Sequence, residues 1–370
     1  MNKFKFLLLL VLLPLNNFFA NSFLDSLIQK NNNLITDSRH TIITNTVKEV
    51  SPAVVGINVT EIRQYRDAFF NDPVMRYFFG DRVYNRKIQG LGSGYIISPD
   101  GYIVTNDHVA GNGSEITVTM TNGTQHKAHI VGTDPSSDIC LLKIEASNLP
   151  FIRFGNSDDL MIGEWVVALG NPFGLFNIND KPTVTVGVIS ATGMNLSGVE
   201  NRYYINMLQT DAAINSGNSG GPLVNSIGEL IGMNTLIYAP GNSGGSVGVG
   251  FAIPSNKIKK IVNLLKNKGV VDRDFWTGLK IQIIDSEIAK YYNLSGTRGV
   301  IVTYVAKNSP ASKAGIQVGD IIFAVNDMRI NDDSALIGIL YEYQTGENVT
   351  FKILRNNEEL NLKMILEKKK

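Results

Sequence analysis

Short apolar or alternating runs fill residues 54–253, separated by Gly, Asn and Pro. Four examples are Ile116–Met120, Trp165–Leu169, Val184–Ile189 and Leu230–Asn234. Many short strands at this spacing are typical of an all-β barrel or sandwich. This part of the chain is therefore expected to be mainly β-structure.

Beyond residue 254 the period of the apolar residues changes. Four of them fall at helical spacing: Ile258, Ile261, Val262 and Leu265. Ser255 or Asn256 is expected to cap the start of this helix, and Gly269 to end it. The spacing predicts a linker helix over residues 256–270 and a domain boundary at about residue 270.

Composition sets further bounds. The 370 residues are 44% hydrophobic and 18% charged, which suits a folded protein with two domains. A net charge of +1 predicts neither a nucleic acid nor an acidic membrane surface as partner. The single cysteine, Cys140, excludes an intrachain disulfide and is expected to be a small buried residue rather than a nucleophile.

Residues 1–20 have the pattern of a secretory signal. Two lysines precede a continuous apolar run from Phe6 to Leu13, which is short for a membrane span. Cleavage is expected after Ala20. An uncleaved N-terminal anchor is the alternative, because Phe18 is bulky for the usual cleavage site.

Residues 217–221 read Gly-Asn-Ser-Gly-Gly. Small residues on both sides of Ser219 let the backbone turn sharply, expose the hydroxyl and leave N–H groups free to stabilise an oxyanion. The same run also fits an ordinary glycine turn. A nucleophile is therefore indicated only if a base and an orienting acid stand elsewhere in the chain.

His108 is the best-placed base among the four histidines. It follows the apolar run Tyr102–Val104, so it is expected at a strand end facing a cleft. The other three stand in polar segments: His40, His126 and His129. No His, Asp or Glu stands at helical i,i+4 spacing from His108 and there is no cysteine pair, so no metal site is predicted.

Asp138 is the predicted orienting acid. It opens an apolar strand, where a carboxylate is costly unless it is paired, and the N–H of His108 would pair it. Asp134 stands in a turn-like Asp-Pro and is interpreted as structural. Asp211 is the alternative acid, although it lies close in sequence to Ser219.

The order His108, Asp138, Ser219 is that of chymotrypsin. The combined pattern resembles the trypsin-like serine proteases and, among them, the HtrA/Deg family, with its DegP/DegQ-like (Do-like) members. Matching segments occur in the family's order at residues 51–55, 91–98, 100–106, 169–174, 209–215 and 250–255. The resemblance covers about residues 44–370 and implies a chymotrypsin/trypsin-like double six-stranded β-barrel over residues 51–255.

This resemblance implies a serine endopeptidase that needs no cofactor, with His108, Asp138 and Ser219 as its triad. The oxyanion hole would be formed by the N–H groups of Gly217, Asn218 and Ser219. A pocket for small or medium aliphatic side chains would be formed by Ile214, Thr235, Leu236 and Ile237. A neutral Asn218 cannot supply the charge used in digestive zymogen activation, so activation by a loop rearrangement is expected.

Residues 271–370 resemble a PDZ domain of the HtrA type. The loop expected to hold the C-terminal carboxylate of a hydrophobic peptide is formed by Trp276, Thr277, Gly278 and Leu279, and such a peptide would add a strand to the sheet. Asp274 departs from the family pattern and would weaken carboxylate binding, with Arg273 beside it offsetting this charge. A glycine kink in a strand is the alternative interpretation.

Two segments are expected to serve regulation and assembly. The insert at about residues 60–90 contains the aromatic-rich stretch Asn71–Asp81, which resembles the family's regulatory loop. It would pack on its own barrel or reach the active site of a neighbouring subunit. Residues 21–50 are expected to contribute oligomer contacts, in a homotrimer or a larger assembly of trimers.

The sequence thus predicts an exported bacterial protease that degrades misfolded or unfolded periplasmic proteins under PDZ control, with chaperone activity as a further expectation. Two alternatives stay open. One is a membrane-anchored regulatory (DegS-like) protease that cuts one signalling client at the inner membrane. The other is mainly a PDZ-led chaperone in which cleavage is minor.

Overall fold

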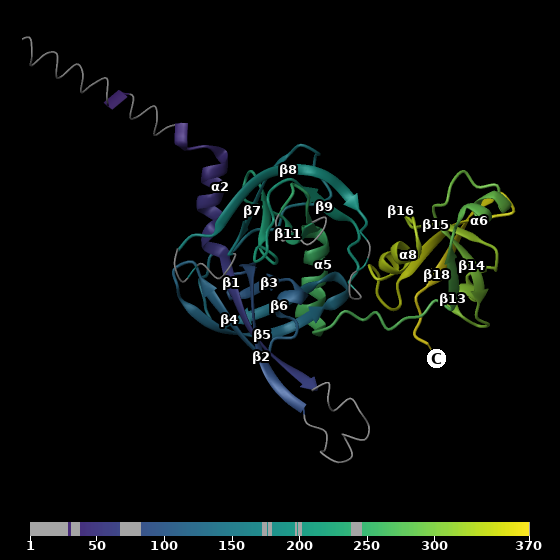
Figure 1. The fold of residues 1–370 in the computed structure, drawn as a ribbon, viewed down its shortest axis with the longest axis horizontal. Helices are drawn as coiled ribbons and strands as arrows, with labels where there is room; N and C mark the ends of the chain where they lie inside the picture. The colour runs from purple at the N-terminus through teal and green to yellow at the C-terminus, as the bar shows by residue number, and fades with distance from the viewer. Residues whose placement is uncertain are drawn as a thin grey trace, which may run out of the picture. The chain divides into compact units, whose positions relative to one another are not determined.

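The computed structural model describes residues 29–30, 38–66, 83–171, 176, 180–196, 198, 202–237 and 246–369. It shows two closed barrels of six strands each, followed by a separate six-stranded sheet (Figure 1). This confirms the mainly β, double-barrel fold expected from the sequence. Helix α2 (Ile42–Val50) and the short helix η1 (Ser51–Ala53) precede the first strand.

The first barrel, drawn mainly in blue in Figure 1, has the strand order β1-β2-β3-β6-β5-β4 and closes through β1 and β4. Its strands are β1 (Val54–Arg66), β2 (Val83–Ile96), β3 (Tyr102–Thr105), β4 (Glu115–Met120), β5 (Gln125–Asp134) and β6 (Ile139–Ile144). Ile57, Ile103 and Leu141 are fully buried in it. Cys140 is also fully buried, as expected.

Strands β1 and β2 continue as a paired hairpin well beyond the barrel, out to the pair Arg66 and Val83. Residues 60–66 and 83–90 are therefore strand arms rather than loop, which narrows the insert expected over residues 60–90. These arms are strands because the antiparallel register of β1 with β2 continues without a break past the pair Thr60 and Gln89 to the pair Arg66 and Val83. The aromatic-rich stretch Asn71–Asp81 lies outside the described residues.

The second barrel has the order β10-β11-β12-β9-β8-β7. Its strands are β7 (Trp165–Gly170), β8 (Thr183–Met194), β9 (Met207–Thr210), β10 (Pro222–Asn225), β11 (Leu230–Ile237) and β12 (Gly250–Pro254). Val166, Ile189 and Leu223 belong to its buried core. Each of the four runs singled out in the sequence lies within a strand of one barrel or the other.

Helix α5 (Ser255–Lys268) contacts β5 and β6 of the first barrel and β11 and β12 of the second. It begins one residue before the predicted linker helix, and its N-cap is Pro254, without a side-chain cap. The prediction of a Ser255 or Asn256 cap is therefore wrong. The Ser255 hydroxyl donates to the Gly155 carbonyl, and the Asn256 N–H is satisfied from outside the helix by Ser157 Oγ at 3.1 Å.

The C-terminal sheet has the order β13-β14-β15-β17-β18, with β16 beside β15. Its strands are β13 (Leu279–Ile283), β14 (Val300–Val305), β15 (Ile321–Val325), β16 (Met328–Arg329), β17 (Asn348–Arg355) and β18 (Glu358–Ile365). The helices between them are α6 (Ser286–Tyr291), α7 (Pro310–Lys313) and α8 (Asp333–Leu340). Val302, Phe351 and Leu336 lie in its core.

Within the described part of the chain, no helix combines the length and the apolar character needed to cross a membrane. The expected signal sequence, residues 1–20, lies outside that part.

Candidate active site

His108 and Asp138 form a close pair on the first barrel. His108 belongs to helix α4 (Asp107–Ala110), which follows β3, and Asp138 joins helix η3 (Pro135–Ser137) to β6. Nδ1 of His108 lies 2.7 Å from Oδ2 of Asp138, and the backbone N–H of His108 donates to Oδ1 at 2.9 Å. With Nδ1 on the carboxylate, Nε2 is the ring nitrogen left to exchange a proton.

Asp138 is fully buried and stands in a left-handed backbone conformation with φ of 58°. Aspartate and asparagine tolerate this conformation better than most residues. Nδ2 of Asn106 donates to Oδ2 of Asp138 at 3.2 Å and to its backbone carbonyl at 3.0 Å. The carboxylate is thus compensated in the way that a buried charge requires.

Two further groups face Asp138 from the segment before β9. The Tyr204 hydroxyl donates to Oδ2 at 3.3 Å, and Nε of Arg202 lies 3.4 Å from Oδ1. Burial and the Asp138 carboxylate raise the pKa of Tyr204, so its phenol stays protonated and able to donate. Burial opposes the charge of Arg202, but Asp138 and then Asp107 raise its pKa overall, so it stays a cation.

Ser219 lies in the turn before β10 of the second barrel. Its Oγ donates to the carbonyl oxygen of Thr235 at 3.2 Å. Its own carbonyl accepts from the N–H of Ser93, on β2 of the first barrel, at 3.0 Å. The turn is therefore fastened across both barrels, and its hydroxyl is held by Thr235.

The backbone around Ser219 leaves two of the three expected oxyanion donors. The N–H of Asn218 donates to the Asn215 carbonyl at 3.0 Å, so in this conformation it is committed elsewhere. Gly217 has a φ of 94°, and its carbonyl accepts from Ser93 Oγ at 2.5 Å. That bond fixes the peptide between Gly217 and Asn218. Because the N–H of Asn218 is committed to Asn215, the candidate oxyanion donors are the N–H groups of Gly217 and Ser219.

Gly220 shows why this turn needs glycine. Its φ is 83°, and a Cβ there would overlap the Ser93 carbonyl and the Thr105 hydroxyl. The Thr105 hydroxyl in turn donates to the same Ser93 carbonyl at 2.7 Å. Any side chain at position 220 would push the nucleophile turn away from β2 and β3, the strands that carry Ser93 and Thr105.

The proposed specificity pocket is described in part. Ile214 is buried and lies against Gly250 of β12, where an added Cβ would come 2.8 Å from its Cδ1. Thr235 is buried and supplies the carbonyl that holds Ser219. The backbones of Leu236 and Ile237 pair with β12, while their side chains lie outside the description.

Asp211, the alternative acid, is engaged within the second barrel, where its Oδ1 accepts the N–H of Val188 on β8 at 2.7 Å. Asp134 forms an ion pair with Arg273, whose Nη2 also donates to Ser137 Oγ at 3.1 Å. Asp134 is thus structural in position, as interpreted from the sequence.

The expected role of Arg273 beside Asp274 is wrong, because Arg273 is buried against Asp134 instead. The cation near Asp274 is Lys368, whose Nζ lies 3.5 Å from it and 3.4 Å from Asp272. The negative charge of Asp274, near the loop expected to bind a carboxylate, is therefore offset by Lys368 of the same domain.

A groove of about 430 Å³ lies between β13 and α8 of the C-terminal domain. All four residues expected to bind a peptide line it, together with apolar side chains that include Ile337, Leu340 and Tyr341. Gly278 has a φ of 77°, and a Cβ there would overlap the Ser309 side chain. The groove thus combines a tight glycine turn with an apolar wall, as a site for a peptide end requires.

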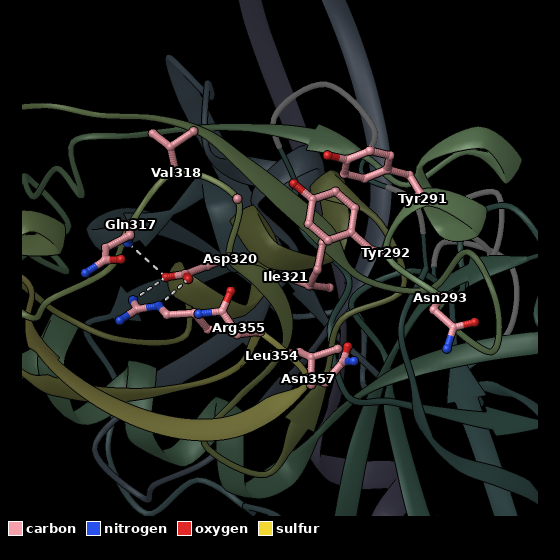
Figure 2. A pocket seen from close by; sticks show the side chains of 12 residues that line it. Tyr291, Tyr292, Asn293, Gln317, Val318, Asp320, Ile321, Leu354, Arg355 and Asn357 are labelled. Atoms are coloured by element: carbon pink, nitrogen blue, oxygen red, sulfur yellow. Dashed lines mark hydrogen bonds and ion pairs between the residues drawn. The ribbon is translucent and has the colours of Figure 1, made fainter.

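A second hollow of about 400 Å³ on this domain is lined in part by the ion pair of Asp320 and Arg355 (Figure 2). Arg355 contacts both carboxylate oxygens at 2.7 Å and donates to the Gly315 carbonyl at 2.7 Å. The N–H of Gln317 completes the cluster at 2.8 Å from Asp320. These charges hold the turn before β15 against β17, so the cluster is structural.

Cys140 stands on β6, two residues after Asp138. Burial, with smaller contributions from Asp107 and Asp138, raises its pKa to about 12. The thiol is therefore no nucleophile at neutral pH. In the described ranges, no three His, Cys, Asp or Glu side chains gather in a way that could hold a metal ion.

Comparisons with known proteins match the two parts of the chain to two domain families. Residues 92–233 match the trypsin-like peptidase domain family and residues 276–366 the PDZ domain family. A probable periplasmic serine endoprotease, DegP-like, from Hahella chejuensis is 40% identical over 333 residues, covering 86% of this chain and 68% of that protein. One from Chlamydia trachomatis is 45% identical over 300 residues, covering 80% of this chain.

Among solved structures, the HtrA-type protease AlgW with a decapeptide matches at 35% identity and a TM-score of 0.65, covering 88% of this chain and 98% of that one. The serine endoprotease from Yersinia pestis matches at 34% identity and a TM-score of 0.56, covering 88% and 98%. This chain spans 58% of the length of the Chlamydia trachomatis relative.

Proposed function

Because this chain belongs to the HtrA-type, DegP-like family of trypsin-fold serine endoproteases, we propose that it hydrolyses peptide bonds of misfolded or unfolded proteins in the bacterial periplasm. The observation that carries the proposal is the close pair of His108 and the buried Asp138, with 2.7 Å between Nδ1 and Oδ2. It stands in the same barrel as Ser93, which fastens the turn of Ser219. The periplasmic location rests on the names of the relatives and on the signal-like residues 1–20.

In the proposed reaction, Ser219 Oγ attacks the carbonyl carbon of the substrate while Nε2 of His108 takes the hydroxyl proton. The tetrahedral intermediate places its oxyanion near the N–H groups of Gly217 and Ser219. His108 then gives the proton to the leaving amine, and an acyl-enzyme forms. Water attacks this ester by the same route in reverse and releases the acid product. Asp138 orients the imidazole and stabilises the imidazolium throughout.

The contact of Ser219 Oγ with the Thr235 carbonyl supports a regulated enzyme. Before attack, the hydroxyl must turn from Thr235 towards His108, and the neighbouring loop must present both oxyanion donors. Asn218 is neutral and 1% exposed, so no buried charge pair at this position can drive the change. We propose that peptide binding in the C-terminal groove or subunit contacts drive it.

The proposed clients are chains that expose small or medium aliphatic residues, since Ile214, which is buried against Gly250, is the proposed apolar floor of the pocket. An apolar pocket separates similar side chains by only a few kcal/mol, which suits many different unfolded proteins. Peptides with hydrophobic C-termini are the proposed ligands of Trp276, Thr277, Gly278 and Leu279. A homotrimer or a larger assembly of trimers, with chaperone activity, completes the proposal.

Degradation of a reduced, unfolded model protein tests the function. The wild type should digest it, and Ser219→Ala should not. Equal digestion by both proteins would reject Ser219 as the nucleophile, and refolding assistance without digestion by either would favour the chaperone alternative.

A serine-directed phosphonate should label the wild type in the presence of a hydrophobic C-terminal peptide. N-terminal sequencing of the mature protein separates a cleaved signal from an inner-membrane anchor, because an anchored protein keeps its first residues.

A further inference from the structure

Residues 202–205, which we call the bridge segment, send alternate side chains to two different parts of the protein. Arg202 and Tyr204 face the carboxylate of Asp138. Tyr203 and Ile205 contact the C-terminal domain instead. Alternation of this kind is what an extended backbone produces, since successive side chains point in opposite directions.

Contacts with the C-terminal domain and with helix η3 anchor the bridge segment. The Tyr203 ring stacks on Tyr341, with 4.9 Å between centroids and 25° between planes. Ile205 is 1% exposed and belongs to the core of the C-terminal domain, where Gly338 of α8 leaves room for it. The N–H of Tyr203 donates to the Ser136 carbonyl at 2.9 Å, which ties the segment to the helix directly before Asp138.

The contacts on the barrel side place a cation and a hydroxyl on a carboxylate that also holds His108. The Arg202 guanidinium spans two acids, with Nη2 3.2 Å from Asp107 and Nε 3.4 Å from Asp138. Its side chain is only 15% exposed, so solvent screens it little. Among the described residues, the titratable or charged groups that act on Asp138 or share a partner with it are His108, Asp107, Cys140, Arg202 and Tyr204.

We propose that Arg202 and Tyr204 are positioning residues of the catalytic machinery, which hold Asp138 and moderate the charge that it presents to His108. Tyr204 donates to the same oxygen, Oδ2, that accepts from Nδ1, and so fixes the plane of the carboxylate. Arg202 neutralises part of the negative field at the imidazole. The inference rests on the proposed function, because it assigns these residues a part in the same reaction.

The sign of the effect follows from the charges. Asp138 favours the imidazolium form of His108, and a cation beside Asp138 opposes this. Loss of the Arg202 charge therefore keeps His108 protonated, and unable to act as a base, up to a higher pH. The acid limb of kcat/KM is expected to move up by about one pH unit. Loss of the Tyr204 hydroxyl frees the carboxylate plane, and kcat is expected to fall about tenfold with KM unchanged.

The test measures the pH dependence of kcat/KM on a quenched fluorescent peptide, with enzyme concentrations corrected by phosphonate titration of active sites. The full chain is used, with saturating hydrophobic C-terminal peptide present. Arg202→Gln should shift the acid limb upwards and Arg202→Lys, which keeps the charge, should restore it. Arg329→Gln and Tyr291→Phe, both on exposed residues of the C-terminal domain, are the matched controls and should keep the wild-type profile.

A purely structural role would lower the melting temperature and the titratable fraction without moving the limb. A second readout is the low-field proton resonance of the His108–Asp138 hydrogen bond, which should shift in Arg202→Gln and in Tyr204→Phe. If Arg202→Gln does not fold, Tyr204→Phe and Arg202→Lys carry the test through kcat and this resonance. An active wild type whose limb and resonance are unchanged in the folded variants overturns this inference alone. Equal activity of wild type and Ser219→Ala overturns the proposed function instead.

Discussion

Arg273, at the start of the C-terminal domain, forms a buried ion pair with Asp134, four residues before Asp138. The two side chains are 7% and 3% exposed. Arg273 also donates to Ser137 Oγ and to the Tyr341 carbonyl. One guanidinium thus joins the linker, the helix that presents Asp138, and the end of α8.

Removing only the arginine should destabilise the protein strongly. A buried pair gives little net stability, but loss of one partner leaves the other charge buried and uncompensated, at a cost of about 3–5 kcal/mol. We expect Arg273→Met to lower the free energy of unfolding in urea by that amount, and the double change Asp134→Asn with Arg273→Met to recover much of it. Lys352→Met, which removes an exposed pair, is the control and should change nothing measurable. Equal loss in the single and double variants would contradict this account.

Two substitutions of Asp138 separate the loss of its carboxylate from the strain of its backbone conformation. Its φ of 58° is tolerated by asparagine but costs alanine roughly 1–2 kcal/mol. Asp138→Asn should therefore keep the fold while kcat drops by about 10⁴-fold, because the amide favours the wrong imidazole tautomer. Asp138→Ala should lose both activity and stability. Circular dichroism melts beside peptide cleavage rates check both, and substantial activity in Asp138→Asn would remove Asp138 from the mechanism.

The fully buried thiol of Cys140 predicts a decline in stability at alkaline pH. Burial raises its pKa from 9.0 to about 12, so between these values the unfolded chain ionises the thiol and the folded chain does not. The stabilisation is complete below pH 9 and is lost as the pH rises towards 12, with a slope of about 1.4 kcal/mol per pH unit from this group. Cys140→Ala lacks that slope, while the buried Tyr95 and Tyr204, whose pKa values are also raised, act alike in both proteins. Parallel urea titrations from pH 8 to 11 decide the matter, and identical slopes would refute it.

Local pattern and spacing predict the strands and the candidate triad residues, whereas the double barrel and the PDZ domain follow from the resemblance to the HtrA/Deg family. Short alternating runs predict strands because their period does not depend on distant contacts, and a glycine-rich turn marks Ser219 for the same reason. Asp138 was found because an acid opening an apolar strand needs a partner. Each of these features depends only on a few residues that are neighbours in the sequence.

Features that depend on distant segments were missed. Nothing next to Arg202 or Tyr204 in the sequence indicates that Asp138 lies within hydrogen-bonding or ion-pairing distance of each. The role of Ser93 in fastening the turn of Ser219 arises only when the two barrels meet. The α5 cap was misplaced for the same reason, since its partner, Ser157, comes from a loop about 100 residues away.

The peptide groove allows a test that spares the fold. Ile337 lines the groove and is 38% exposed, so a charge there costs little stability but faces any apolar C-terminal side chain of a bound peptide. Ile337→Glu should weaken binding of a fluorescent peptide with an aliphatic C-terminus at least about tenfold, because an unpaired carboxylate would be desolvated on binding.

Ile283→Glu, on an exposed β13 residue outside the groove lining, is the matched control and should bind as the wild type does. Fluorescence anisotropy measures both, and amidation of the peptide C-terminus should weaken binding in every variant if the loop around Gly278 holds the carboxylate. Unchanged binding in Ile337→Glu would place the peptide elsewhere on the domain.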